Sequence, residues 1–266
     1  MPVVNSTGTR QTVWRILKGK RQDRIPKLHF TFDDPFERPG FVPQFKSLKA
    51  EELERELPDL EDRLLLLDFD ETLWLLNSTE EFLAQARPAW LARAILTSVI
   101  LLRPVGRRLW PEKWFYWKDW MRVRSITFLM PWCLRSWRRR AKTLGREHQN
   151  IELIRILTSK TPLKVVVVSN GFRPLISPLL DGMELQVDQL IAAPLISGGA
   201  WRQRGKRVNA EAEIPPQTLD DACFVTDHLD DADLLSRVGA GIVCVWPKAS
   251  FRRPGAPVED VLSSRS

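Results

Sequence analysis

The sequence has few cysteines and no apolar segment long enough to cross a membrane. The longest apolar stretch, residues 89–102, is shorter than the roughly 20 residues of a spanning helix and contains Arg93. The first residues lack the apolar run of a signal peptide. The three cysteines are scattered, without zinc-ligand spacing: Cys133, Cys223 and Cys244. We therefore expect a reduced, cytoplasmic protein without zinc, which can still touch the cytoplasmic face of a membrane.

Positive charge is concentrated in one segment. The chain contains 40 Lys or Arg and 33 Asp or Glu, a formal net charge of +7. Between Arg87 and Arg146 there are fifteen basic residues and two acids, Glu112 and Asp119, so this segment carries +13 and the rest of the chain −6. The composition thus divides the chain into an acidic body and a cationic insert.

Short apolar runs that stop at polar residues predict a parallel sheet. Leu64–Leu67 is a continuous apolar run that ends at Asp68, as expected for a strand buried on both faces. Similar runs occupy residues 165–168, 223–225 and 241–246, with a weaker one at 190–196. Helix-length segments such as Arg173–Leu180 and 231–238 separate them. The alternation predicts an α/β fold with a doubly wound parallel sheet.

The insert interrupts this alternation and is predicted to be helical. Trp110, Trp114, Trp117 and Met121 fall on one face of a helix that Pro111 opens, and Pro131 ends or kinks the next piece. We divide the chain into four parts. These are a basic arm and Pro-rich connection at 1–60 with a helix near 48–56, a core at 61–76 and 161–250, a helical cap at 77–160, and a tail at 251–266.

Two carboxylates follow the first predicted strand, at the edge where doubly wound sheets bind ligands. Asp68 and Asp70 repel each other unless a cation such as Mg²⁺ offsets their charge. One carboxylate can attack phosphorus, and the other can protonate the leaving group and later take a proton from water. A plain strand-ending turn is the alternative interpretation of this Asp-Phe-Asp segment.

Polar residues also follow two other predicted strands. Ser169, Asn170 and Gly171 offer a hydroxyl and backbone N–H groups to a phosphate at a strand-to-helix junction. Asp227 and Asp231 follow the 223–225 strand, where they are also typical of a helix cap.

Taken in order, these motifs resemble the haloacid dehalogenase (HAD) superfamily. Its phosphatases carry Asp-x-Asp-x-Thr, then Ser or Thr, then Lys, then Asp-x-x-x-Asp. The resemblance covers about residues 63–247 and implies a HAD-like Rossmannoid core, with the helical cap inserted between the first and second motifs. It implies a Mg²⁺-dependent phosphatase in which Asp68 is the nucleophile and a metal ligand. Asp70, which dehalogenases lack, would be the general acid/base and bind the metal through its carbonyl group.

The resemblance also implies roles for the other residues. Ser169, with the Asn170 and Gly171 amides, would hold the phosphoryl group. Lys206 would neutralise the nucleophile and the phosphate. Asp227 would be the remaining carboxylate ligand, and Asp231 would support the metal site or the lysine.

The sequence departs from the family pattern at three positions. Glu71 and Thr226 stand where glycine is usual, and His228 either tunes the metal or faces solvent. The assignment of Lys206 competes with solvated charges nearby, which belong to Arg202, Arg204 and Arg207.

The cap leaves three interpretations of the substrate open. Eight of the eleven tryptophans lie between Trp74 and Trp137 among the basic residues. This mixture is typical of an anionic bilayer interface, which predicts a lipid-linked or other membrane-surface phosphate as substrate. The tryptophans could instead form the core of the cap. A groove for single-stranded nucleic acid is the third interpretation, either on a phosphatase that acts on a polynucleotide end or on a binding or scaffold protein with a weak or idle core.

Overall fold

The structure, a computed structural model, describes residues 45–58, 60–102, 104, 106, 108, 114–160 and 162–246. The predicted arm up to residue 44 and the tail at 251–266 lie outside the described residues. So do Trp110 and Pro111, at the predicted start of the tryptophan-bearing helix.

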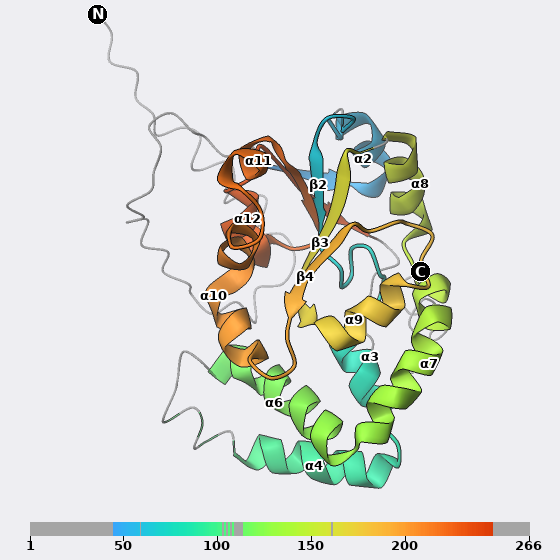
Figure 1. Ribbon diagram of the computed structural model, residues 1–266, viewed down its shortest axis with the longest axis vertical. Helices are drawn as coiled ribbons and strands as arrows, with labels where there is room; N and C mark the ends of the chain where they lie inside the picture. Colours follow the sequence, from blue (N-terminus) through green and yellow to red (C-terminus); the bar gives the residue numbers. More distant parts are fainter. Residues whose placement is uncertain are drawn as a thin grey trace, which may run out of the picture. The chain divides into compact units, whose positions relative to one another are not determined.

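Six parallel strands form one sheet, in the order β1-β6-β5-β2-β3-β4 (Figure 1). Five of them correspond to the five predicted apolar runs, so the α/β fold with a parallel sheet is confirmed. The strands are β1 (Phe45–Lys49), β2 (Leu64–Leu67), β3 (Lys164–Phe172), β4 (Gln189–Ala193), β5 (Cys223–Thr226) and β6 (Ala240–Val245).

The sixth strand, β1, is absent from the sequence-based prediction. The helix expected at 48–56 begins later, as α2 (Ala50–Glu56), and the segment before it pairs in parallel with β6. Strand β1 lies at the edge of the sheet, where a strand has one neighbour and often carries lysine. Its sequence, Phe-Lys-Ser-Leu-Lys, therefore lacks the continuous apolar run that identified the central strands.

Helices cover both faces of the sheet, because successive strands are added first toward β4 and then, after β4, in the opposite direction. Helices α2, α8 (Ile151–Lys160) and α9 (Arg173–Leu180) lie on one side, within the connections that run toward β4 (Figure 1). Helices α10 (Gly198–Glu211), α11 (Pro216–Asp221) and α12 (Ala232–Leu235) lie on the other, as right-handed crossovers require. The reversal creates a topological switch point between β2 and β5, where such sheets bind ligands.

The central strands are buried on both faces, as the sequence predicts. All four leucines of β2 are buried, and so is every residue of β5. Burying a leucine side chain contributes roughly 1.5–3 kcal/mol. The residue that follows β2 is thus anchored by a strand whose residues are all buried.

The cap is helical within the described residues. It contains α3 (Ser78–Ala84), α4 (Ala89–Leu101), α6 (Trp114–Leu129) and α7 (Pro131–Glu147). Helix α6 ends at Leu129, just before Pro131, as expected, and Pro131 also opens α7, which was not predicted. Within the described residues, no helix combines the length and the apolar character that crossing a membrane requires.

Two predicted boundaries shift. Helix α8, assigned to the cap from the sequence, lies beside the sheet next to α2 (Figure 1), and Arg155 Nη2 is 3.8 Å from Glu54 Oε2. It connects directly to β3, so the helices that leave the sheet end near Glu147. The helix predicted at 231–238 is shorter, with a 3-10 turn at Leu229–Asp231 followed by α12.

The burial of the cysteines predicts low thiol reactivity in the folded protein. Cys133, Cys223 and Cys244 are all buried, and burial raises the pKa of the Cys223 and Cys244 thiols to about 12. Because the thiolate is the reactive form, we expect Ellman's reagent at pH 8 to label none of the three quickly in the native protein and all three after unfolding. Rapid labelling of any cysteine in the folded state would contradict this packing.

Candidate functional site

The site is built around Asp68, the residue that follows β2 at the switch point. The residue is 8% exposed. Asp68 Oδ1 accepts a hydrogen bond from its neighbour Phe69 N at 2.8 Å and lies 2.6 Å from Lys206 Nζ. Burial raises the pKa of the Asp68 carboxyl to about 8, although the ammonium of Lys206 lowers it. The ion pair therefore offsets part of the cost of burying this carboxylate.

Lys206 links two carboxylates inside the protein. Only 3% of the residue is exposed, and Nζ lies 2.7 Å from Asp231 Oδ2 as well as 2.6 Å from Asp68 Oδ1. Burial lowers the pKa of Lys206, but Asp231 and Asp68 more than offset this effect and raise it above its ordinary value. Of the basic residues around position 206, this lysine is the one at the site.

A break in α10 turns Lys206 inward. Gly205 has φ 84° and ψ 165°, a combination that is essentially restricted to glycine. A Cβ atom on Gly205 would lie 2.7 Å from Asp233 Oδ2. The same carboxylate accepts a hydrogen bond from Arg207 N at 3.1 Å, just beyond the break. Gly205 and Asp233 together set the backbone that presents Lys206.

Asp70 is held by the first helix of the cap. Its Oδ1 accepts from Ser78 N at 2.6 Å and its Oδ2 from Ser78 Oγ at 3.2 Å. Burial raises the pKa of Asp70 to about 6, although the Ser78 hydrogen bonds lower it. Directly after Asp70, Glu71 adopts φ 64°, a conformation that glycine adopts without strain.

Ser169 and Gly171 lie beside Asp70 at the end of β3. Ser169 is 1% exposed, and its Oγ accepts a hydrogen bond from Gly171 N at 3.0 Å. A Cβ atom on Gly171 would be 3.1 Å from Asp70 Oδ2, so a larger side chain would crowd the carboxylate. Asn170 Oδ1 is buried and has no hydrogen-bond partner within the described part of the chain. The three residues predicted to hold phosphate are thus gathered next to the acids.

The acids after β5 separate into two environments. Asp227 Oδ1 accepts from Thr72 Oγ1 at 3.2 Å, and burial raises the pKa of Asp227 while Lys206 lowers it. Asp231 Oδ2 accepts from Thr226 Oγ1 at 2.6 Å in addition to its contact with Lys206. Asp231 therefore supports the lysine directly.

The other departures from the expected motif also have structural explanations. The hydroxyl of Thr226, where glycine is usual, lies between Asp231 and Asp68, whose Oδ2 is 3.4 Å away. His228 has a side chain that is 64% exposed, and its Nδ1 accepts from Asp230 N at 3.0 Å. Its imidazole faces solvent, as one of the two sequence interpretations states.

The chemistry of the acidic side chains suits a magnesium ion. As they stand, the described residues contain no group of three or more His, Cys, Asp or Glu side chains that could hold a metal ion. Mg²⁺, however, commonly uses one or two carboxylates and takes waters and phosphate oxygens as its other ligands. Asp68 and Asp227 follow the neighbouring strands β2 and β5. Together with Asp70 and Asp231 they set four carboxylates against the single ammonium of Lys206, an excess of negative charge that a divalent cation would offset.

Helix α6 of the cap packs on the start of α10. Trp120 Nε1 donates to Leu195 O at 2.8 Å, and the rings of Trp117 and Trp120 lie so close to Gly198 and Gly199 that added Cβ atoms would be 2.9–3.3 Å from them. These two tryptophans pack between cap and core.

An ion pair also connects the cap to the core. Arg202 Nη2 lies 3.3 Å from Asp119 Oδ2, so an arginine of α10 meets an acid of α6.

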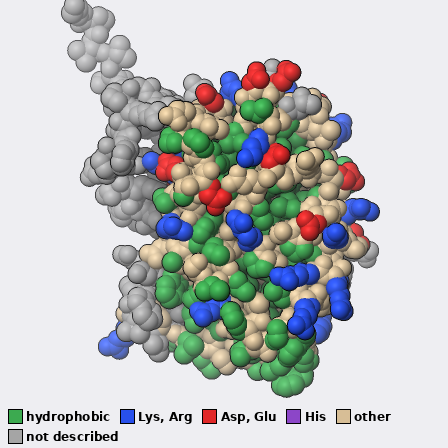
Figure 2. Space-filling view, in the orientation of Figure 1, with side chains coloured by type: hydrophobic (Ala, Val, Ile, Leu, Met, Phe, Trp, Pro, Cys, Tyr) green, Lys and Arg blue, Asp and Glu red, His purple; other side chains and the backbone are tan. Residues whose placement is uncertain are grey.

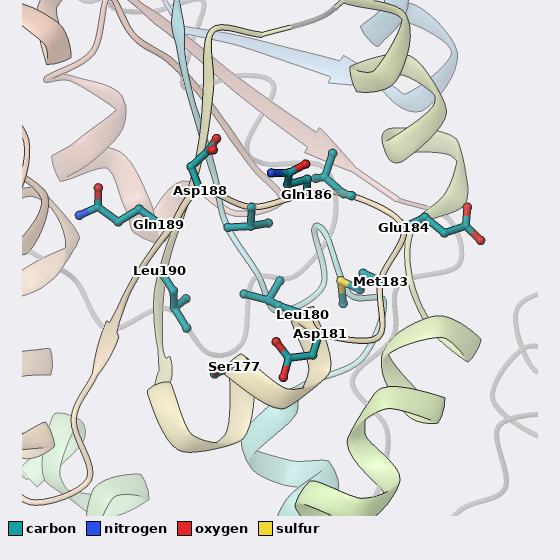
Figure 3. A pocket seen from close by; sticks show the side chains of 11 residues that line it. Ser177, Leu180, Asp181, Met183, Glu184, Gln186, Asp188, Gln189 and Leu190 are labelled. Atoms are coloured by element: carbon teal, nitrogen blue, oxygen red, sulfur yellow. The ribbon is translucent and has the colours of Figure 1, made fainter.

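A separate hollow of about 400 Å³ lies away from these residues (Figure 3). It is lined by the end of α9, the loop that follows and the start of β4. Asp188 N in its wall donates to Val165 O, near the beginning of β3. The hollow is therefore beside the amino ends of the strands and takes no part in the arrangement around Asp68.

Comparison with known proteins leaves the site without an established relative. The sequence matches no protein-family model and no curated protein. Among solved structures, a protein of unknown function from Bordetella pertussis Tohama I is similar, with 18% identity and a TM-score of 0.45, over 68% of this chain and 89% of that one. A likeness this distant indicates neither a substrate nor a reaction.

The eight candidate site residues named from the sequence lie close together in the structure. The residues that hold them in place were not all predicted. Ser78, Gly205 and Asp233 were not singled out. Asn77 before the cap's first helix is a typical N-cap, and it accepts from Glu80 N, so this signal could have drawn attention to Ser78. A glycine directly before the lysine, within a helix-length segment, was the available signal for the break.

Replacing Gly205 with alanine tests the break in α10. We expect Gly205→Ala to lower the free energy of unfolding by about 1–3 kcal/mol, because alanine disfavours this backbone conformation and its methyl group would displace the Asp233 carboxylate. Urea denaturation measures the loss. Gln203→Ala, at an exposed position of the same helix, is the matched control and should change stability by less than about 0.5 kcal/mol. Equal effects of the two substitutions would refute a special role for Gly205.

Replacing Thr226 with valine tests the hydroxyl that bonds to Asp231. Valine keeps the shape but removes a donor to a buried carboxylate, so we expect a loss of about 1–3 kcal/mol in stability. Thr218→Val, at an exposed position, provides the comparison and should be close to neutral. An unchanged urea midpoint for Thr226→Val would mean that the hydroxyl does not stabilise the Lys206 site.

Proposed function

We propose that the protein is a HAD-type phosphatase that hydrolyses a phosphate monoester in the presence of Mg²⁺. The observation that carries the proposal is the 2.6 Å ion pair between Lys206 Nζ and Asp68 Oδ1 at the switch point of a doubly wound sheet. Asp70 and Ser169 stand beside this pair. The order of these residues in the sequence supports the same assignment.

Asp68 would act as the nucleophile. Its carboxylate oxygen attacks the phosphorus atom, a P–O bond forms to Asp68, and the P–O bond to the leaving group breaks. Lys206 stabilises the charge on the transferring group, because a buried ammonium interacts more strongly than one in water. Ser169 and the amides of Asn170 and Gly171 would hold the phosphoryl oxygens, for which the Gly171 N–H must turn from Ser169 Oγ to the substrate.

Asp70 would transfer the protons. It gives its proton to the leaving alkoxide, and in the second step it takes a proton from the water that attacks phosphorus. That step breaks the bond to Asp68 and releases orthophosphate. A pKa of about 6 suits a group that must both donate and accept a proton near neutral pH. Ser78 orients the carboxylate through both of its oxygens.

Asp68, Asp227 and the Asp70 carbonyl group would hold Mg²⁺, and Asp231 would act on the site through Lys206. When bound, Mg²⁺ would neutralise negative charge on the phosphoryl group.

Hydrolysis of p-nitrophenyl phosphate at neutral pH tests the proposal. We expect turnover that requires Mg²⁺ and stops when the ion is chelated. Asp68→Asn should abolish it, because an amide is a poor nucleophile, and Asp70→Asn should lower kcat by about 10²–10⁴-fold through loss of proton transfer. The control is Asp181→Asn, which changes an exposed acid next to the hollow of Figure 3 and should leave activity unchanged.

The same assay, extended to a panel of phosphate esters, separates the enzyme from the alternative. A selective cap predicts turnover of some esters and rejection of others, always dependent on Asp68. Absence of turnover across the panel, together with absence of Mg²⁺ binding by calorimetry, would favour a scaffold or binding protein with an idle core.

A further inference from the structure

One face of the cap carries large apolar side chains that are exposed among the described residues. Trp90 is 70% exposed and Leu101 is 72% exposed, one near each end of α4. They are eleven residues apart, which is three helical turns, so they project from the same side of the helix over about 16 Å. The exposed apolar residues of this face, called here the cap face, are Trp90, Ile100, Leu101, Phe128, Leu129 and Trp132.

Hydrogen bonding and packing bring these residues together from three helices. Trp132 Nε1 at the start of α7 donates to Arg87 O, just before α4, at 2.7 Å. Helix α6 packs against α4 and ends at Leu129, two residues before α7 begins. Figure 2 shows hydrophobic side chains gathered at the lower end of the molecule, where α4 lies in Figure 1. An apolar patch of this kind marks an interaction surface.

Arginines surround the cap face. Arg87, Arg93 and Arg135 are exposed on the loop before α4, on α4 itself and on α7. Arg124 lies over the Phe128 ring, with its guanidinium 5.6 Å from the ring centre. Asp119, an acid of α6, already lies within 3.3 Å of both Arg122 and Arg202.

We propose that the cap face docks on the surface of an anionic lipid bilayer. Leucine and isoleucine suit the acyl region, tryptophan suits the headgroup depth, and arginine pairs with lipid phosphate. Half of the six apolar residues are aliphatic and cannot stack on bases. The composition of this surface therefore differs from that of proteins that bind single-stranded nucleic acid, which use aromatic side chains for stacking. The docking rests on the cap residues alone and does not depend on the proposed phosphatase activity.

Co-sedimentation of the full chain with vesicles tests the docking. We expect binding to phosphatidylcholine vesicles that contain phosphatidylglycerol, and much weaker binding to phosphatidylcholine alone. Trp90→Gln/Leu101→Gln should lower partitioning into the anionic vesicles at least about tenfold, because two buried apolar side chains are lost. Arg93→Gln/Arg135→Gln should lower it by about fivefold for each arginine at low salt.

The matched control changes two apolar residues of similar exposure outside the cap. Ile151 and Leu163 are 66% and 68% exposed, and Ile151→Gln/Leu163→Gln should bind vesicles like the native protein. Unfolding midpoints confirm that each variant is folded.

Two outcomes would overturn the proposal. The first is equal vesicle binding by the native protein and Trp90→Gln/Leu101→Gln, which would mean that charge alone, without insertion, holds the protein. The second is failure to bind anionic vesicles at low salt. Salt-dependent binding to a single-stranded oligonucleotide in that case would assign the surface to nucleic acid.

Discussion

The buried ammonium of Lys206, held between Asp68 and Asp231, is the interaction on which the rest of the site depends. Removing one partner of a buried ion pair leaves an uncompensated charge and costs about 3–5 kcal/mol. The lysine reaches this position because α10 breaks at Gly205, and it stays there because Thr226 and Asp231 complete its surroundings. This one cation offsets part of the rise in the Asp68 pKa that burial causes.

The cap takes part in the site as well as covering it. Ser78, the first residue of α3, binds both oxygens of Asp70, so the proposed proton-transfer group is oriented from the cap side. Trp120 and Arg202 connect α6 to the segment that leads to Lys206. A movement of the cap would therefore change the positions of Asp70 and Lys206 together, which would couple substrate entry to the proposed phosphoryl transfer.

The sequence predicted the parts of the molecule that follow strong, local patterns. Leu64–Leu67 could be recognised because a central strand is apolar on both faces, and Asp68, Ser169 and Asp227 could be placed because the carboxyl ends of parallel strands meet at one edge. Strand β1 was missed because an edge strand needs no apolar run. The central strands and the polar residues that follow them could be predicted because they leave local patterns in a single sequence.

The remaining features depend on contacts between distant segments. The inward turn at Gly205 requires Asp233, which lies on another element, and the orientation of Asp70 requires Ser78 from the cap. The tryptophans show the same limit: Trp120 packs inside while Trp90 is exposed, although both come from one aromatic, basic segment. Composition cannot separate a packed indole from a docking one, since only the fold determines which face of each helix is covered.

The most direct test of the central claim is to trap the intermediate. The protein would be quenched in acid during turnover of a phosphate ester, reduced with borohydride, which converts an aspartyl phosphate to homoserine, and analysed by peptide mass spectrometry. The account predicts homoserine at position 68 in the native protein and none in Asp68→Asn. Modification at another residue, or turnover with no trapped acyl phosphate under conditions where it should accumulate, would contradict the assignment of Asp68 as the nucleophile.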